Sequence, residues 1–198
     1  MKKKTVALLL ALTLVLGVVA GGTIAWLTST SDTVTNTFTT SDIKITLTED
    51  AGKDANYQFK MVPGWKITKD PKVKVESGSE ACWLFVEVTE NDVLKNYIEY
   101  SVQTGEGKWT QGKGTDTANG GDGIPTNVYY RAVTSIPTDG ATFEILTNNQ
   151  VTVKDSVTKT NMNDLDKEGA TKPVLTFRAY ACQYYKDNTT PFTAPQAW

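Results

Sequence analysis

The 198-residue chain contains no histidine and only two cysteines. The absence of histidine excludes Ser-His-Asp and Cys-His catalytic groups, and it excludes zinc sites built on imidazole. Cys82 and Cys182 are not part of a Cys-x-x-Cys motif, so neither a dithiol redox centre nor a thiolate zinc cluster is expected. In an exported protein they are candidates for one disulfide. The alternative is two buried thiols that pack as small apolar side chains.

Charge is also sparse. Charged residues make up 21% of the chain, and the formal net charge is -2. Loss of residues 1–25, which include three lysines and no acidic residue, would change the net charge to -5. Nucleic acids and anionic membranes bind through basic surface, so we expect no nucleic acid as a partner.

Motifs that carry catalytic chemistry are missing as well. The chain has no Walker loop, no Gly-x-Ser-x-Gly elbow and no His-Glu-x-x-His helix. The Gly-rich loop Thr115–Thr126 contains Asp116, Asn119 and Asp122, whose oxygens would suit Ca²⁺, but their spacing is not that of an EF-hand. A solvated hairpin loop is the simpler interpretation, and Ca²⁺ binding stays an open alternative. We therefore expect no enzyme activity, no cofactor and no metal site, and a secreted hydrolase is the weakest hypothesis.

What the chain does have is a long apolar run near its start. Three lysines precede the apolar run Val6–Ala20, two glycines follow it, and small residues lead to a cleavage point between Ala25 and Trp26. This is the layout of a secretory signal peptide. Because apolar character continues to Leu27, an uncleaved membrane anchor is the alternative. We expect residues 1–25 to be removed by a membrane signal peptidase, which gives a secreted protein in the extracellular matrix or on the cell surface.

A Thr- and Ser-rich segment, Thr28–Ser41, follows the predicted cleavage point. In an extended chain Val34, Asn36 and Phe38 would share one face, and threonines would occupy the other. We expect residues 26–41 to form an extended N-terminal arm that pairs with an open strand edge. The alternatives are that the arm folds back onto its own subunit or stays a disordered spacer. In a pairing arm, the apolar subunit contacts would be Trp26, Leu27, Val34 and Phe38.

Residues 42–198 contain many short alternating segments with turn residues between them, and little helical pattern. This predicts a single all-β domain, an antiparallel jelly-roll-like β-sandwich with short helical insertions. The segment Ala81–Thr89 is apolar on both faces, so we place it in the middle of the sandwich. Short helices are expected at Asn91–Ile98 and Asn161–Glu168. The other main expected strands are Ile43–Leu47, Tyr57–Met61, Val73–Val75, Tyr100–Val102, Asn127–Val133, Phe143–Ile145, Val151–Val153 and Val174–Tyr185.

Three stretches of sequence resemble the TasA/camelysin family of bacterial surface proteins, which a SipW-type signal peptidase releases. They are GGTIAWLTSTSDTVTNTFTTSDIKITL (21–47), MVPGWKITKDPKVKVESGSEACWLFVEV (61–88) and AYACQYYKDNTTPFTAPQAW (179–198). The resemblance implies a jelly roll that assembles into extracellular fibres of a biofilm matrix or of a cell or spore surface. It also implies that the mature N-terminal arm inserts as a strand into a neighbouring subunit.

The chain departs from that family in its cysteine pair and in the Gly-rich insert around 104–126. Some relatives carry a metallo-endopeptidase label, but a zinc site of that kind cannot be built without histidine. The main hypothesis is therefore a homopolymeric fibre protein. The alternative is a monomeric exported adhesin or carbohydrate-binding sandwich that uses exposed aromatic residues such as Trp109 and Tyr130.

Overall fold

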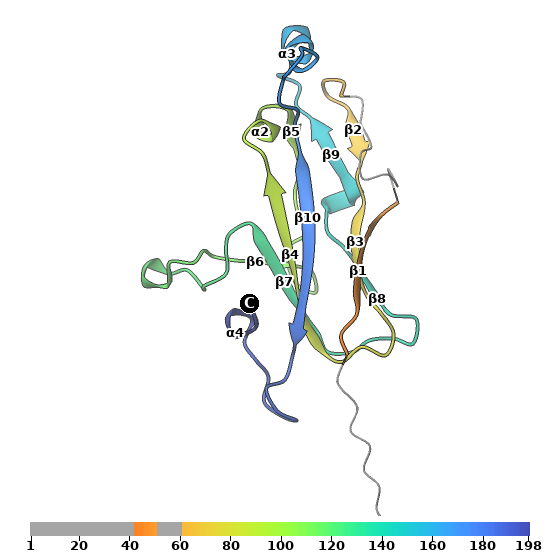
Figure 1. The fold of residues 1–198 in the computed structure, drawn as a ribbon, viewed down its shortest axis with the longest axis vertical. Coiled ribbons are helices and arrows are strands. Elements are labelled where there is room, and N and C mark those ends of the chain that lie inside the picture. The colour runs from red at the N-terminus through yellow and green to blue at the C-terminus, as the bar shows by residue number, and fades with distance from the viewer. Residues whose placement is uncertain (1–41, 51–60) are drawn as a thin grey trace, which may run out of the picture. The chain divides into compact units, whose positions relative to one another are not determined.

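The computed structural model describes residues 42–50 and 61–198 (Figure 1). The chain divides into two units between Thr39 and Thr40, and the described residues all belong to the second unit. The predicted signal peptide 1–25, its cleavage point and the predicted arm 26–41 lie outside the described residues, as does most of the expected strand Tyr57–Met61. Within the described part of the chain, no helix is long and apolar enough to cross a membrane.

The described residues form three antiparallel sheets and few helices, so the predicted all-β, sandwich-like fold is confirmed at that level. The first sheet has the order β1-β3-β8, the second β10-β4-β7-β6 and the third β2-β9-β5. The strands are β1 (Ile45–Glu49), β2 (Lys66–Thr68), β3 (Pro71–Val75), β4 (Cys82–Glu90), β5 (Ile98–Glu99), β6 (Thr110–Gln111), β7 (Val128–Val133), β8 (Ala141–Glu144), β9 (Gln150–Val153) and β10 (Leu175–Gln183). The helices are α2 (Leu94–Tyr97), α3 (Lys159–Leu165) and α4 (Ala194–Ala197).

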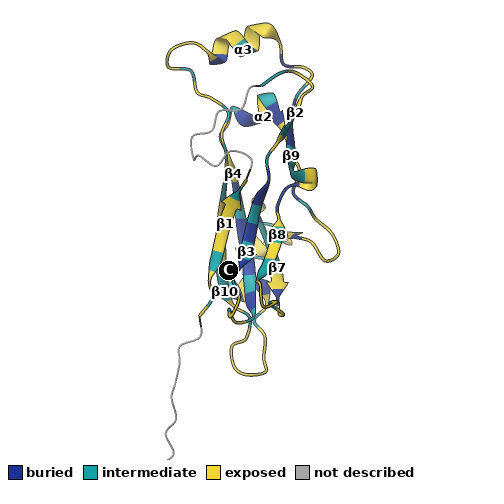
Figure 2. Cartoon of the chain, turned by 90° about the vertical axis from the view of Figure 1, so that its right-hand side faces the viewer, coloured by how far each residue is buried: buried dark blue, intermediate teal, exposed yellow. Residues whose placement is uncertain are grey.

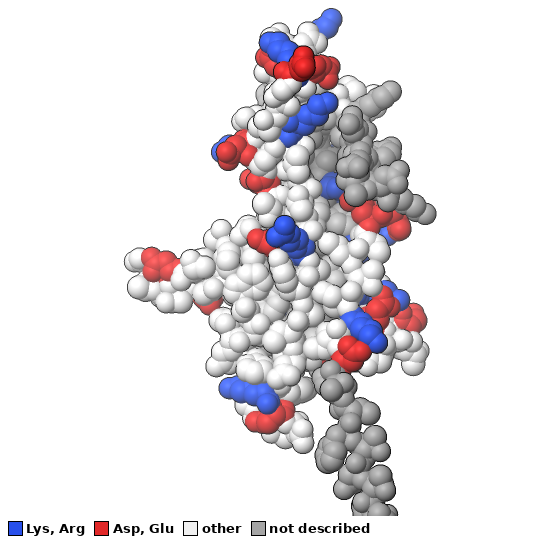
Figure 3. All heavy atoms as spheres, viewed as in Figure 1, with Lys and Arg blue, Asp and Glu red and all other residues white. Residues whose placement is uncertain are grey.

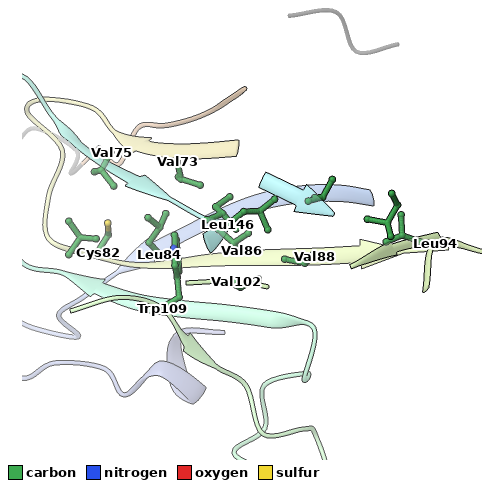
Figure 4. Packing of buried hydrophobic residues seen from close by; sticks show 14 of the residues in the cluster. Val73, Val75, Cys82, Leu84, Val86, Val88, Leu94, Val102, Trp109 and Leu146 are labelled. Atoms are coloured by element: carbon green, nitrogen blue, oxygen red, sulfur yellow. The ribbon is translucent and has the colours of Figure 1, made fainter. Parts of the chain in front are cut away.

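The main core lies between the first and second sheets. Val73 and Val75 of β3 are fully buried in one cluster with Leu84 and Val86 of β4 (Figure 4). Trp109, which precedes β6, projects into the same layer of side chains. Each of these strands alternates, so one face supplies the core and the other is free for solvent or for a further layer.

Strand β4 is covered on both faces, as its sequence predicted. Cys82, Leu84, Val86 and Val88 belong to the main core, while Phe85 on the opposite face is 1% exposed. Phe85 belongs to a second, smaller cluster that consists otherwise of Ile124, Val128 and Ala194. The C-terminal segment therefore packs as an outer layer over the second sheet.

The short elements differ from their predicted bounds for local reasons. Helix α2 begins at Leu94 and not at Asn91. The Asn91 side-chain oxygen closes the turn before it by accepting hydrogen bonds from the backbone N–H groups of Leu94 and Val174, both at 3.1 Å. Asn91 thus ties the start of β10 to the end of β4. Helix α3 begins at Lys159 because Thr158 forms a capping box with Asn161.

The expected strand at Tyr100–Val102 is reduced to one isolated bridge between Val102 and Leu146. Backbone hydrogen bonds from Gln103 to Ile145 and from Thr147 to Ser101 flank this bridge, at 2.8 and 2.9 Å. The segment therefore joins the end of β8 to the loop that carries Trp109.

Candidate functional site: an open strand edge

Two strand edges lie together on one side of the sandwich. β1 is an edge strand of the first sheet and β10 is an edge strand of the second. The two strands contact each other, but no ladder joins them among the described residues. An edge strand presents a row of backbone N–H and C=O groups, and that row can pair with another chain.

The longer of the two edges is that of β10. This strand has nine residues and pairs with β4 along all of them, from Leu175 opposite Glu90 to Gln183 opposite Cys82. No described strand pairs with its other side. At about 3.3 Å per residue, the free edge is about 30 Å long. β1 adds a shorter edge of five residues, paired on one side with β3.

The inward side chains at these edges are incompletely buried. Phe177, Ala179 and Ala181 of β10 pack against the core but are only half-buried. Leu47 of β1 is 37% exposed, although it lies opposite Val73, which is fully buried in the next strand. Figure 2 shows the same contrast, with β3 coloured mainly as buried and β1 as intermediate or exposed. We call Leu47, Phe177, Ala179 and Ala181, with the two free backbone edges beside them, the open edge.

One end of the open edge is closed by an ion pair. The Lys69 ammonium lies 3.0 and 3.1 Å from the two carboxylate oxygens of Glu49 at the end of β1. The same ammonium lies 5.6 Å from the centre of the Phe177 ring. Both side chains of the pair are largely buried, at 14% and 24% exposed, so the pair fixes this end more firmly than a surface pair would.

The two cysteines are free thiols in the structure. Cys82 faces the main core, while Cys182 is on the opposite face of the same sheet with the smaller cluster. Cys182 lies opposite Trp83 in the ladder, one position away from Cys82, so the two Cβ atoms point to opposite faces. The candidate disulfide is therefore absent. Burial, and secondarily the Cys182 thiol, raise the pKa of Cys82 to about 11.

Trp109 was predicted as an exposed aromatic residue that binds carbohydrate, and this is wrong. It is 1% exposed, and its indole N–H donates to the Glu144 carbonyl oxygen at 2.8 Å. The Arg131 guanidinium lies 3.9 Å from the centre of the Phe143 ring and 5.6 Å from that of Trp109. Partial burial of the Arg131 guanidinium lowers the pKa of Arg131. Tyr130, the other residue named for that role, is half-buried on the opposite face.

A surface hollow of about 540 Å³ lies beside this group of residues. Among the described residues that line it, Glu144 alone carries a carboxylate, which accepts a hydrogen bond from the Gln103 amide at 3.2 Å. Retaining and inverting glycoside hydrolysis both require two facing carboxyl groups. The hollow does not offer such a pair.

In the Gly-rich loop Thr115–Thr126, the aspartate carboxylates accept hydrogen bonds mainly from backbone N–H groups in and near the loop. Asp116 accepts hydrogen bonds from the N–H groups of Ala118 and Asn119 and from the Asn119 amide. These hydrogen bonds lower the pKa of Asp116, and the one from the Asn119 side chain has the largest effect. One oxygen of Asp122 accepts from the backbone N–H groups of Lys113 and Ile124. Among residues 42–50 and 61–198, no three acidic or thiol side chains gather as a metal site would need.

The predicted subunit-contact residues Trp26, Leu27, Val34 and Phe38 lie outside the described residues. The structure does describe an open strand edge, which sequence reasoning did not locate. Comparisons with protein-family models, curated proteins and solved structures found no match to this chain.

Proposed function

We propose that the protein is an exported structural subunit that assembles into extracellular fibres of a biofilm matrix or cell surface. The N-terminal arm of one subunit adds a strand to the open edge of the next. The observation that carries this proposal is the incomplete burial of Leu47 and Phe177 at two adjoining free strand edges. An added strand there would satisfy backbone groups and cover apolar surface in one step.

The arm has the right length and pattern for this role. Thr28–Ser41 has fourteen residues and would span about 45 Å when extended, which exceeds the free edge of β10. Val34 and Phe38 fall on one face of an extended chain, where they would meet Phe177 and Leu47. The arm carries a single charged residue, Asp32, so its insertion buries little charge.

Such an addition is directional. The arm and the open edge are different surfaces. Each subunit would insert its arm into one neighbour and accept the arm of another neighbour at its open edge. A contact of this kind is heterologous and does not close on itself unless the rotation happens to form a ring. A filament is the expected product. The Lys69–Glu49 pair at one end of the open edge would limit how far the inserted strand could slide.

The same proposal includes three further points: the strands follow a jelly-roll order, the chain is cleaved after Ala25, and the protein is not an enzyme. Cleavage would release the protein and create the arm in a single event, which links export to assembly. The presence of apolar anchors only a few residues after the predicted cut supports this link.

Two paired substitutions in the arm test the proposal. We expect Val34→Asp with Phe38→Asp to abolish filaments seen by electron microscopy, because both carboxylates would face the core of the next subunit. Thr35→Asp with Thr37→Asp adds the same charge to the opposite face and is the matched control. It should leave filaments in place.

Deletion of Trp26–Thr39 is the second test, with the deleted protein examined by circular dichroism and analytical ultracentrifugation. A folded monomer without filaments is the expected result. If the deleted protein still forms filaments, strand donation is refuted. If both paired variants behave alike, the arm does not bind as an alternating strand.

A further inference from the structure

The outer face of the second sheet, opposite the main core, carries an almost continuous series of aromatic rings. Ring contacts link neighbours from Tyr185 through Tyr184 and Trp83 to Tyr130, and from there through Phe85 and Trp198 to Tyr180. The centroids of neighbouring rings are 4.9 to 6.2 Å apart. We call these seven residues the aromatic face: Trp83, Phe85, Tyr130, Tyr180, Tyr184, Tyr185 and Trp198.

Three of these rings reach the surface. Tyr180 and Tyr185 are each 41% exposed, and Trp198 is 44% exposed. The aliphatic residues of this layer, Ile124 and Val128, are fully buried beneath it. The large exposed apolar side chains of this face are therefore rings. A sugar can stack its C–H groups on exposed aromatic faces of this kind.

The aromatic face also carries very little charge. On the lower half of the second sheet, the outward positions of β10, β4 and β7 hold rings, Cys182 and Ala132. The charged residues nearest to them on this face are Glu87 and Arg178, at its upper border, where Glu87 accepts a hydrogen bond from the Tyr180 hydroxyl. Figure 3 shows this area as a broad region without blue or red atoms around α4 and the lower part of β10. An uncharged surface suits an uncharged ligand, because no ion has to lose its hydration when the ligand binds.

The rings are held in place before any ligand arrives. The Tyr180 hydroxyl donates to a Glu87 carboxylate oxygen at 3.1 Å, and the Trp83 indole N–H donates to the Phe192 carbonyl oxygen at 2.8 Å. The Trp198 ring lies 5.3 Å from Phe85 and 5.8 Å from Tyr180, centre to centre. Fixed rings lose little conformational entropy on binding, which favours affinity.

We propose that the aromatic face binds a neutral polysaccharide, with Tyr180, Trp198 and Tyr185 stacking on successive sugar rings. The ring centres of Tyr180 and Trp198 lie 5.8 Å apart, and Tyr185 follows Tyr180 by five residues along the chain, so a chain of several linked sugars would be needed to reach all three. This inference uses the outer face of the second sheet and does not rest on fibre assembly at the open edge.

The test is retention of the full protein on three uncharged polymers: cellulose, chitin and cross-linked dextran. We expect retention on at least one of them, and an affinity about tenfold lower in Tyr180→Ala and in Trp198→Ala. Tyr180→Phe keeps the ring and should keep binding. Trp65→Ala is the matched control, because Trp65 is 60% exposed but precedes β2, outside the aromatic face.

Thermal unfolding of each variant shows whether the fold is intact, and Tyr185→Ala provides a second position if Trp198→Ala does not fold. Failure of the protein to bind any of the three polymers would overturn the inference. An equal loss in Trp65→Ala would also overturn it, because binding would then be non-specific. If the face variants weaken self-association and sugar retention is absent, the face joins copies of this chain and the inference is wrong.

Discussion

Replacement of Leu47 by lysine tests the open edge at the residue whose exposure identifies it. Leu47 is 37% exposed in the subunit and would be covered by an inserted strand. Full burial of a leucine side chain is worth about 2 kcal/mol, so the remaining third contributes about 0.7 kcal/mol to assembly. Loss of that term alone, as in Leu47→Ala, should raise the critical concentration for filaments about threefold.

Leu47→Lys has a larger expected effect because an unpaired ammonium would have to lose its water under the inserted strand. That desolvation costs several kcal/mol, so the critical concentration should rise at least about a hundredfold. The assay is sedimentation of filaments across a concentration series. Thr48→Lys is the control, because Thr48 is exposed on the opposite side of the same strand. The reasoning is refuted if both lysine variants assemble equally well while both remain folded.

Three further predictions concern stability and titration. Trp109→Ala should lower the free energy of unfolding by about 3–5 kcal/mol in urea, because it empties a site that is 1% exposed and removes the hydrogen bond to Glu144; a loss under about 1 kcal/mol would contradict this. At pH 8 the Cys82 thiol, with a pKa of about 11, should react with a maleimide more than about a hundredfold slower in the native protein than in guanidinium, and equal rates would show that the thiol is accessible. Backbone N–H groups of Thr189 and Thr190 hold the pKa of Asp187 at about 2, below its ordinary value of 3.8, so the ionised carboxylate stabilises the fold above pH 3.8 and this contribution is lost as the pH falls to about 2; an NMR titration midpoint near 3.8 would disprove these hydrogen bonds.

The strand pattern was predictable where period-two alternation is strong. The segments around Ile45, Val73 and Phe177 were placed on strands, because one face of each packs on a single core. β4 was placed in the middle of the sandwich because it is apolar on both sides. The sequence could not tell what covers its outer face, since Ala194 and Trp198 are more than a hundred residues further along the chain.

The candidate site was less predictable. An open edge depends on which strands end up without a neighbour, and that is a property of topology which no local pattern encodes. The aromatic residues show the same limit. Trp109 lies in the polar stretch GEGKWTQGK and is buried, whereas Tyr180 lies in the more apolar stretch TFRAYACQ and is 41% exposed. Cys82 and Cys182 lie on adjacent strands, but a register offset of one residue puts their sulfurs on opposite faces.

The double-sided burial of β4 has a consequence for how the chain folds during its synthesis. Its apolar segment is synthesised well before its partners β7 and β10, and Trp83 pairs with a residue about one hundred positions later. Until those partners arrive, Ala81–Val88 is a β-prone, nearly uncharged stretch with no cover. Contacts of such long sequence separation also form slowly. The single charge within that stretch, Glu87, is therefore well placed to limit aggregation while the chain is still incomplete.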